Sequence, residues 1–155
     1  MRDDQHNLDF HASVIWNLVS VALSDLGWSA SEVANGLHVV FGDPVWDDCC
    51  GKAATISMGN IGPSRYDRSP AAMGCTRFDV PWSVDLVDCV EYRDDGSLSN
   101  SSVEKAVAAA QAALDAILCA AVAAPGVWVV SAGTVGPQGG CISTRVQLRT
   151  LYEVC

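Results

Sequence analysis

Residues 77–92 have the sequence RFDVPWSVDLVDCVEY, and this stretch decides the fold. From Phe78 to Leu86 apolar side chains alternate with polar ones, which is the period of two shown by a strand with one buried face. From Leu86 to Tyr92 apolar residues occur on both faces of the strand, so we expect this end of the strand to lie in the buried middle of a sheet. Pro81 has no N–H to donate to a ladder and therefore predicts an edge or a bulge.

The patterns on either side of this strand predict two helices. Apolar residues recur every three or four positions over about residues 9–26, and Gly27 is suited to end that helix. The same spacing continues from a capping box at residues 101–104 until Pro125 and Gly126 stop it. The many alanines of the second helix would let it approach a sheet closely.

Short apolar or alternating runs between turn residues predict the remaining strands, at residues 37–41, 54–58, 127–130 and 144–155. Residues 59–74 and 133–140 are rich in glycine and other turn formers, and we expect them to be loops. The pattern predicts one α+β domain over residues 1–155, ordered α-β-β-β-α-β-β, with two helices packed on one mostly antiparallel sheet.

The chain is acidic, with 18 Asp and Glu residues against 9 Lys and Arg residues and a net charge of -9. Binding DNA by neutralising phosphates needs clustered Lys and Arg, so this balance argues against a conventional nucleic-acid binder. The first residues lack the basic and apolar regions of a signal peptide, and Gln111 and Asp115 interrupt the longest apolar run, residues 106–124. We expect a soluble protein made in the cytoplasm, with no membrane partner.

Seven cysteines are many for a chain of 155 residues. Their odd number and the missing export signal favour thiols, ahead of disulfides that form after release from a reducing cell. A zinc site comes third, because no CxxC spacing is present. The cysteines in loop-like contexts, which could meet in space, are Cys49, Cys50, Cys75 and Cys141.

The sequence predicts no catalytic residue, no metal and no cofactor. The three histidines, His6, His11 and His38, are too scattered for an obvious catalytic set. Residues 136–140 are glycine-rich but lack the lysine of a phosphate-binding loop, and no helix N-terminus follows them. Paired aspartates occur without the ligand spacing of an EF-hand. We therefore expect a protein that is not an enzyme.

Two short motifs carry a family resemblance. Residues 46–50, WDDCC, and residues 136–141, GPQGGC, together with the strand at 84–93, resemble neck or tail-end proteins from long-tailed phages of actinobacteria. The order of elements is also similar to that of phage tail terminator proteins, which have an N-terminal helix, a β-sheet, one crossing helix and a final long strand. The resemblance spans the chain from about Val39 onward.

This resemblance implies a virion structural protein at the head–tail junction, assembled in the host cytoplasm. A tail terminator of this kind forms a ring, expected to be a hexamer, that caps the tail tube, ends its growth and docks the head connector. The implied partners are further copies of the chain, the major tail protein, a head–tail connector or stopper protein, and genomic DNA that passes without sequence-specific binding. An acidic channel would repel the phosphates of that DNA.

Candidate residues follow for the contacts and for the channel. The candidate interaction residues are Trp46, Asp47, Asp48, Trp128, Pro137, Gln138, Gly139 and Gly140. The candidate acidic residues of the channel are Asp79, Asp85, Asp94 and Asp95.

Three other functions compete with the tail terminator. A head–tail connector or stopper protein shares the small size and the ring. A small thiol-dependent enzyme or regulator would use the loop cysteines, and a monomeric adaptor domain would form no ring.

Overall fold

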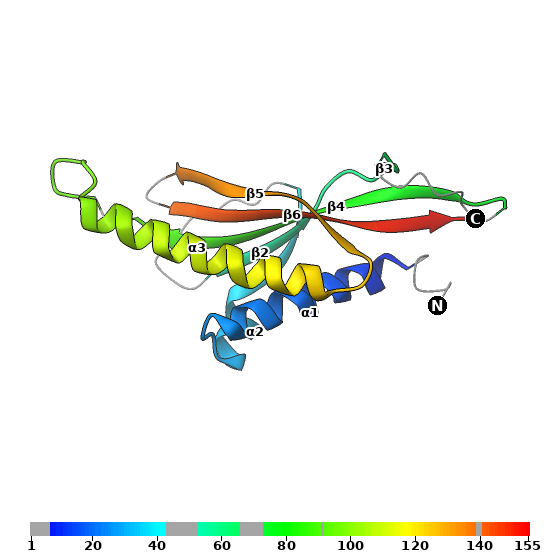
Figure 1. Ribbon diagram of the computed structural model, residues 1–155, viewed down its shortest axis with the longest axis horizontal. Coiled ribbons are helices and arrows are strands. Elements are labelled where there is room, and N and C mark those ends of the chain that lie inside the picture. The colour runs from blue at the N-terminus through cyan, green and yellow to red at the C-terminus, as the bar shows by residue number, and fades with distance from the viewer. Residues whose placement is uncertain (1–6, 43–52, 66–72, 91, 139–140) are drawn as a thin grey trace.

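The computed structural model describes residues 7–42, 53–65, 73–90, 92–138 and 141–155. These ranges contain three helices and six strands (Figure 1). In chain order they are α1 (Leu8–Asp25), α2 (Ala30–Gly36), β1 (Leu37–Phe41), β2 (Ala53–Met58), β3 (Gly62–Pro63), β4 (Thr76–Cys89), α3 (Asn100–Ala123), β5 (Val127–Gln138) and β6 (Cys141–Val154).

The strands form one mixed sheet in the order β1-β2-β4-β6-β5, and β3 pairs with β4 beside this path. β1 and β2 are parallel, whereas every other pair of described strands is antiparallel. The expected α+β class and the mostly antiparallel sheet are therefore confirmed. The ladder between β4 and β6 is the longest, running in unbroken register from Thr76 opposite Val154 to Cys89 opposite Cys141.

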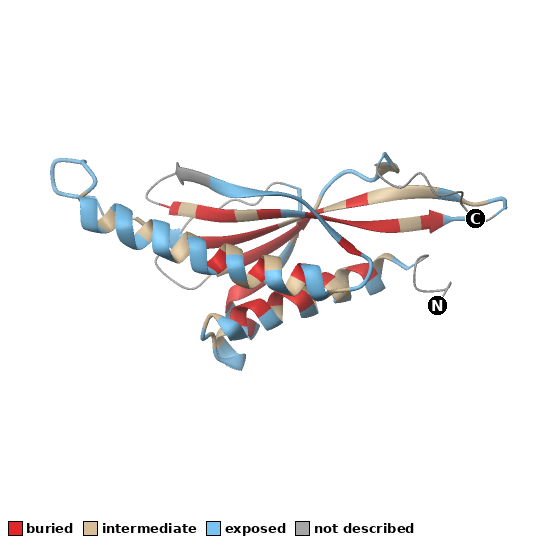
Figure 2. Ribbon diagram, viewed as in Figure 1, coloured by how far each residue is buried: buried red, intermediate tan, exposed pale blue. Residues whose placement is uncertain are grey.

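Helices α1 and α3 lie together on one face of the sheet (Figure 1). Alternation along β4 and β6 turns Trp82, Val84 and Val146 toward these helices, where Ile15 of α1 and Ile117 of α3 complete a buried core. Burial is concentrated between the helices and the central strands (Figure 2). The alternation in residues 78–86 thus defines the core face, as expected from the period of two. The expectation that residues 86–92 enter the buried middle of the sheet is wrong, because β4 ends at Cys89 and Tyr92 is 43% exposed.

A polar group sits inside this core. The hydroxyl oxygen of Thr150 lies 2.8 Å from Nδ1 of the buried His11 and accepts from Nε1 of Trp82 at 2.9 Å. One β6 side chain therefore satisfies polar atoms from α1 and β4, which stabilises their packing because a buried polar atom without a partner is costly. His11 has a packing role here.

The structure differs from the predicted helices in two ways. α2 was not predicted, because seven residues are too few for a periodic pattern; its start is set by a reciprocal capping box between Ser29 and Glu32. α3 begins after Ser99, whose hydroxyl accepts from the N–H of Ser102 at 3.1 Å, so the capping box predicted at 101–104 is wrong. The chain thus has a third helix, and the expected two-helix order is incomplete.

Two predicted loops contain strand. β3 lies within residues 59–74, and β5 runs through the glycine-rich stretch to Gln138. This stretch is extended because it pairs with the long β6, with Gly133 opposite Arg145. The pairing with β6 cannot be seen in the composition of residues 133–140 themselves, which is why that composition suggests a loop.

Pro81 occupies a central strand without breaking its register with β6. On the other side of β4, pairing with β2 ends at Trp82 and pairing with β3 begins at Asp79. The Pro81 carbonyl accepts from the N–H of Gly59 at 2.9 Å in this gap. A proline is tolerated here because the missing N–H falls where the ladder is interrupted.

Candidate interaction surfaces

The sheet face opposite the helices carries three ion pairs that join β4 to β6. Arg77 pairs with Glu153 at 3.2 Å and Asp85 with Arg145 at 2.8 Å, and in both cases the two residues are directly opposite each other. Asp79 pairs diagonally with Arg149 at 3.0 Å. The same alternation that directs apolar side chains into the core directs these charged side chains to the sheet face away from the helices.

Asp85 is the most deeply placed of these charges, with its side chain 0% exposed. Its Oδ1 accepts from the hydroxyl of Ser143 and from Nε of Arg145, both at 2.8 Å. Its Oδ2 is buried with no hydrogen-bond partner. The charge of Asp85 is thus compensated inside the sheet.

The four acidic residues predicted for a channel fall into two groups. Asp79 and Asp85 are paired with arginines within the sheet. Asp94 and Asp95 lie in an exposed turn between β4 and α3. Hydrogen bonds from the Ser97 hydroxyl and then from the Ser97 N–H hold the pKa of Asp95 below its usual range, so this exposed carboxylate stays ionised.

Trp128 of β5 is 42% exposed and lies against Arg149, whose guanidinium carbon is 4.5 Å from the ring centroid. Arg149 also donates to Asp79, whose carboxylate accepts from the Ser64 hydroxyl at 3.0 Å. These contacts connect β5, β6 and β4 to the residues after β3. The predicted interaction residue Trp128 is therefore a surface residue supported by a cation–π contact.

For the other predicted interaction residues the structure gives at most the backbone. Pro137 and Gln138 belong to β5 by their backbone, and Gln138 pairs with Cys141 at the end of the β5–β6 hairpin. The remaining five, Trp46, Asp47, Asp48, Gly139 and Gly140, lie outside the described residues.

Three of the described cysteines differ from the favoured thiol state, whereas Cys119 is a free thiol. Cys75 and Cys155 form a disulfide, and Cys141 is also disulfide-bonded. The ladder between β4 and β6 explains the Cys75–Cys155 pair. Thr76 lies opposite Val154, so Cys75, which precedes Thr76, and Cys155, which follows Val154, meet at the same end of the ladder. In the described ranges Cys75, Glu153 and Cys155 form the one group of three metal-ligating side chains, but a disulfide occupies both sulfurs.

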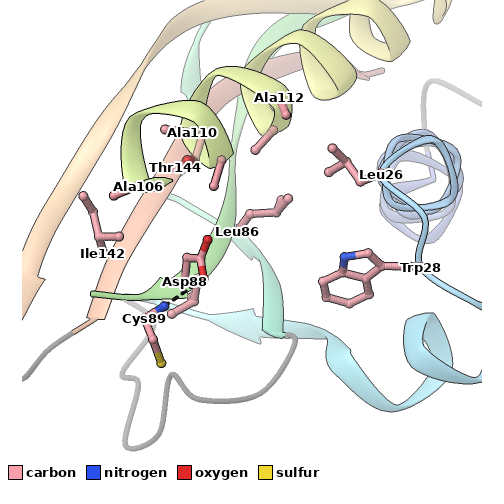
Figure 3. A pocket seen from close by; sticks show the side chains of 13 residues that line it. Leu26, Trp28, Leu86, Asp88, Cys89, Ala106, Ala110, Ala112, Ile142 and Thr144 are labelled. Atoms are coloured by element: carbon pink, nitrogen blue, oxygen red, sulfur yellow. Dashed lines mark hydrogen bonds between the residues drawn. The ribbon is translucent and has the colours of Figure 1, made fainter. Parts of the chain in front are cut away.

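A cleft of about 410 Å³ opens between α3, the end of α1 and strand β4 (Figure 3). Figure 3 shows Leu26 and Trp28 facing Ala110 and Ala112 of α3 across this space. Asp88 also lines the cleft, and its Oδ1 accepts from the N–H of Cys89 at 2.9 Å. No histidine is among the lining residues in the described part of the chain.

α3 is apolar along its length but is docked mainly by its C-terminal half. Its buried residues, Ala113, Ile117 and Ala121, all lie in that half. In the described residues α3 is the one helix long and apolar enough to cross a membrane, and 17% of its apolar 18-residue window is buried. Ile117 and Ala121 are 0% exposed and belong to the core, which gives the helix a packing role.

The outermost strands of the sheet, β1 and β5, expose apolar side chains. On β1 Val39 is 41% and Phe41 is 81% exposed. On β5 Val129 is 40% and Val130 is 45% exposed beside Trp128. Of the residues in these two strands, only Trp128, Pro137 and Gln138 were predicted from the sequence as interaction residues. A usable signal was present, because residues 37–41 and 127–138 contain no charged residue.

Comparison with known proteins gives matches among solved structures alone. No protein-family model and no curated protein matches this chain. Among solved structures, a chain from the virion of a native gene transfer agent (GTA) particle is 12% identical to it, with a TM-score of 0.43. The match covers 87% of this chain and 93% of that chain.

Proposed function

We propose that this protein is a structural subunit of a phage-type virion and acts as a tail terminator at the head–tail junction. Several copies, expected to be six, form a ring that caps the tail tube, ends the addition of major tail protein and docks the head connector or stopper. Genomic DNA passes through the ring without sequence-specific binding. The protein assembles in the host cytoplasm and remains in the neck of the virion.

The observation that carries the proposal is the architecture expected from the resemblance to tail terminators. An N-terminal helix, α1, precedes the sheet, α3 crosses one face of it, and the chain continues to the 14-residue strand β6. The remaining short elements, α2 and β3, are additions that leave this order unchanged.

The charge distribution supports passage of DNA. Each of the three ion pairs of the sheet joins one arginine (Arg77, Arg145 or Arg149) to one acidic residue and is neutral as a pair. The surplus of acidic residues therefore lies elsewhere on the chain. Asp94 and Asp95 are exposed and close together, and they are the stronger candidates for a channel lining. A ring of subunits, each with a net charge of -9, would present repulsive potential to phosphates.

Deleting the gene and measuring tails by electron microscopy tests the role. Without a cap that stops subunit addition, tails should become variable and longer than in the wild type, and heads should remain unattached. Antibody labelling of wild-type particles should mark the neck. Tails of normal length that still fail to join heads would instead support the connector or stopper function. Normal, infectious particles without the protein would refute a structural role.

A further inference from the structure

The two outer strands of the sheet share an unusual property. β1 and β5 form opposite ends of the strand order, and no described strand pairs with their outer edges. The chain has 18 acidic and 9 basic residues, yet none of them lies in β1 or β5. The buried ladder between β4 and β6, by contrast, contains the charges of all three ion pairs.

This distribution leaves the outer strands without the charged side chains that usually protect a solitary sheet. An outer strand presents unpaired N–H and C=O groups, and proteins usually protect it with charged side chains, prolines, bulges or a covering loop. Of these devices β5 has Pro137 at its far end and a bulge at Val130, and it has no charged side chain. Here Phe41 on β1 is 81% exposed, and Val130 on β5 is 45% exposed at a break in the register with β6. Exposed, uncharged edges of this kind are suited to pair with another strand.

We propose that the outer edge of β1 in one copy pairs with the outer edge of β5 in the next, around residues 127–131. This inference rests on the proposed ring and names the surfaces that close it. A head-to-tail contact uses both edges of every subunit and closes into a ring when the rotation permits. A two-fold contact of β5 with β5 would leave Phe41 uncovered.

Electrostatics makes these uncharged edges the least costly place for a second copy to approach. Two copies that each carry a net charge of -9 repel, so they approach with least cost where neither surface carries charge. Both proposed surfaces meet this condition, and both expose β-branched or aromatic side chains that pair well across strands.

Lysine substitutions test the two edges separately. In the full chain Phe41→Lys and Val130→Lys should each convert the wild-type oligomer to a monomer in sedimentation velocity, with the circular dichroism spectrum unchanged. The matched control is Val122→Lys on α3, because Val122 is also 81% exposed. Each change makes the net charge less negative, so general repulsion between copies cannot explain a loss of assembly. The control should assemble as the wild type does.

Mixing the two monomeric variants determines the polarity of the contact. Phe41→Lys retains a good β5 edge and Val130→Lys retains a good β1 edge, so the mixture should form a heterodimer and stop there. A Phe41→Lys variant that still dimerises would show a two-fold β5 contact and overturn the proposal. A wild-type oligomer that survives both substitutions would overturn these surfaces while leaving the ring intact. A monomeric wild type would contradict the ring itself and assign the edges to a different partner.

Discussion

At the residue scale, Asp85 shows how the polar face of the sheet is held together. Its carboxylate is enclosed, and Oδ1 receives hydrogen bonds from Ser143 and Arg145 of the neighbouring strand. An enclosed charge is tolerated when a partner compensates it, and removal of one partner leaves the other charge without compensation. Arg145 is only 27% exposed in its side chain, so water cannot fully replace the carboxylate.

We expect Asp85→Ala to lower the free energy of unfolding by roughly 3 kcal/mol, since it leaves Arg145 without its carboxylate. Asp85→Asn retains an acceptor of similar shape and should cost less. Urea unfolding followed by tryptophan fluorescence measures both variants. Asp94→Asn, in the exposed turn, is the control and should change stability little. Equal stability of Asp85→Ala and the wild type would contradict a structural role for this ion pair.

At the element scale, sequence patterns predicted the helices and strands that depend only on their own residues. The alternation of residues 78–86 and the helical spacing of residues 9–26 each need only their own segment, and both were confirmed as β4 and α1. Pairing between distant segments was not predictable in the same way. Asp85 and Arg145 are 60 positions apart, and Cys75 and Cys155 are 80 apart, so their contacts depend on the ladder between β4 and β6.

The start of α3 can be tested with two serines. Ser99 caps the helix through the N–H of Ser102, whereas Ser101 lies inside the first turn. We expect Ser99→Ala to lower the free energy of unfolding by about 1 kcal/mol, because it removes the N-cap acceptor. Ser101→Ala should have a much smaller effect, since alanine is a good helix former. Thermal unfolding by circular dichroism compares the two. A larger loss for Ser101→Ala would instead support the capping box predicted from the sequence.

At the scale of the whole molecule, charge and assembly oppose each other. Each copy has a net charge of -9, and the ion pairs are internal to the sheet, so charged groups are not expected to hold copies together. The attraction between uncharged edges is instead apolar contact and backbone pairing, which salt does not screen. The long-range repulsion is screened, because the Debye length falls from about 30 Å at 0.01 M salt to about 10 Å at 0.1 M.

Assembly should therefore strengthen as sodium chloride rises through this range. Sedimentation velocity at one protein concentration should show a growing oligomer fraction, and Val122→Lys should follow the same trend. Phe41→Lys should remain monomeric at every salt concentration, because screening cannot restore a blocked edge. Assembly that weakens with salt would mean that charged pairs between copies supply the attraction. Such pairs would have to lie away from β1 and β5, since neither strand contains a charged residue.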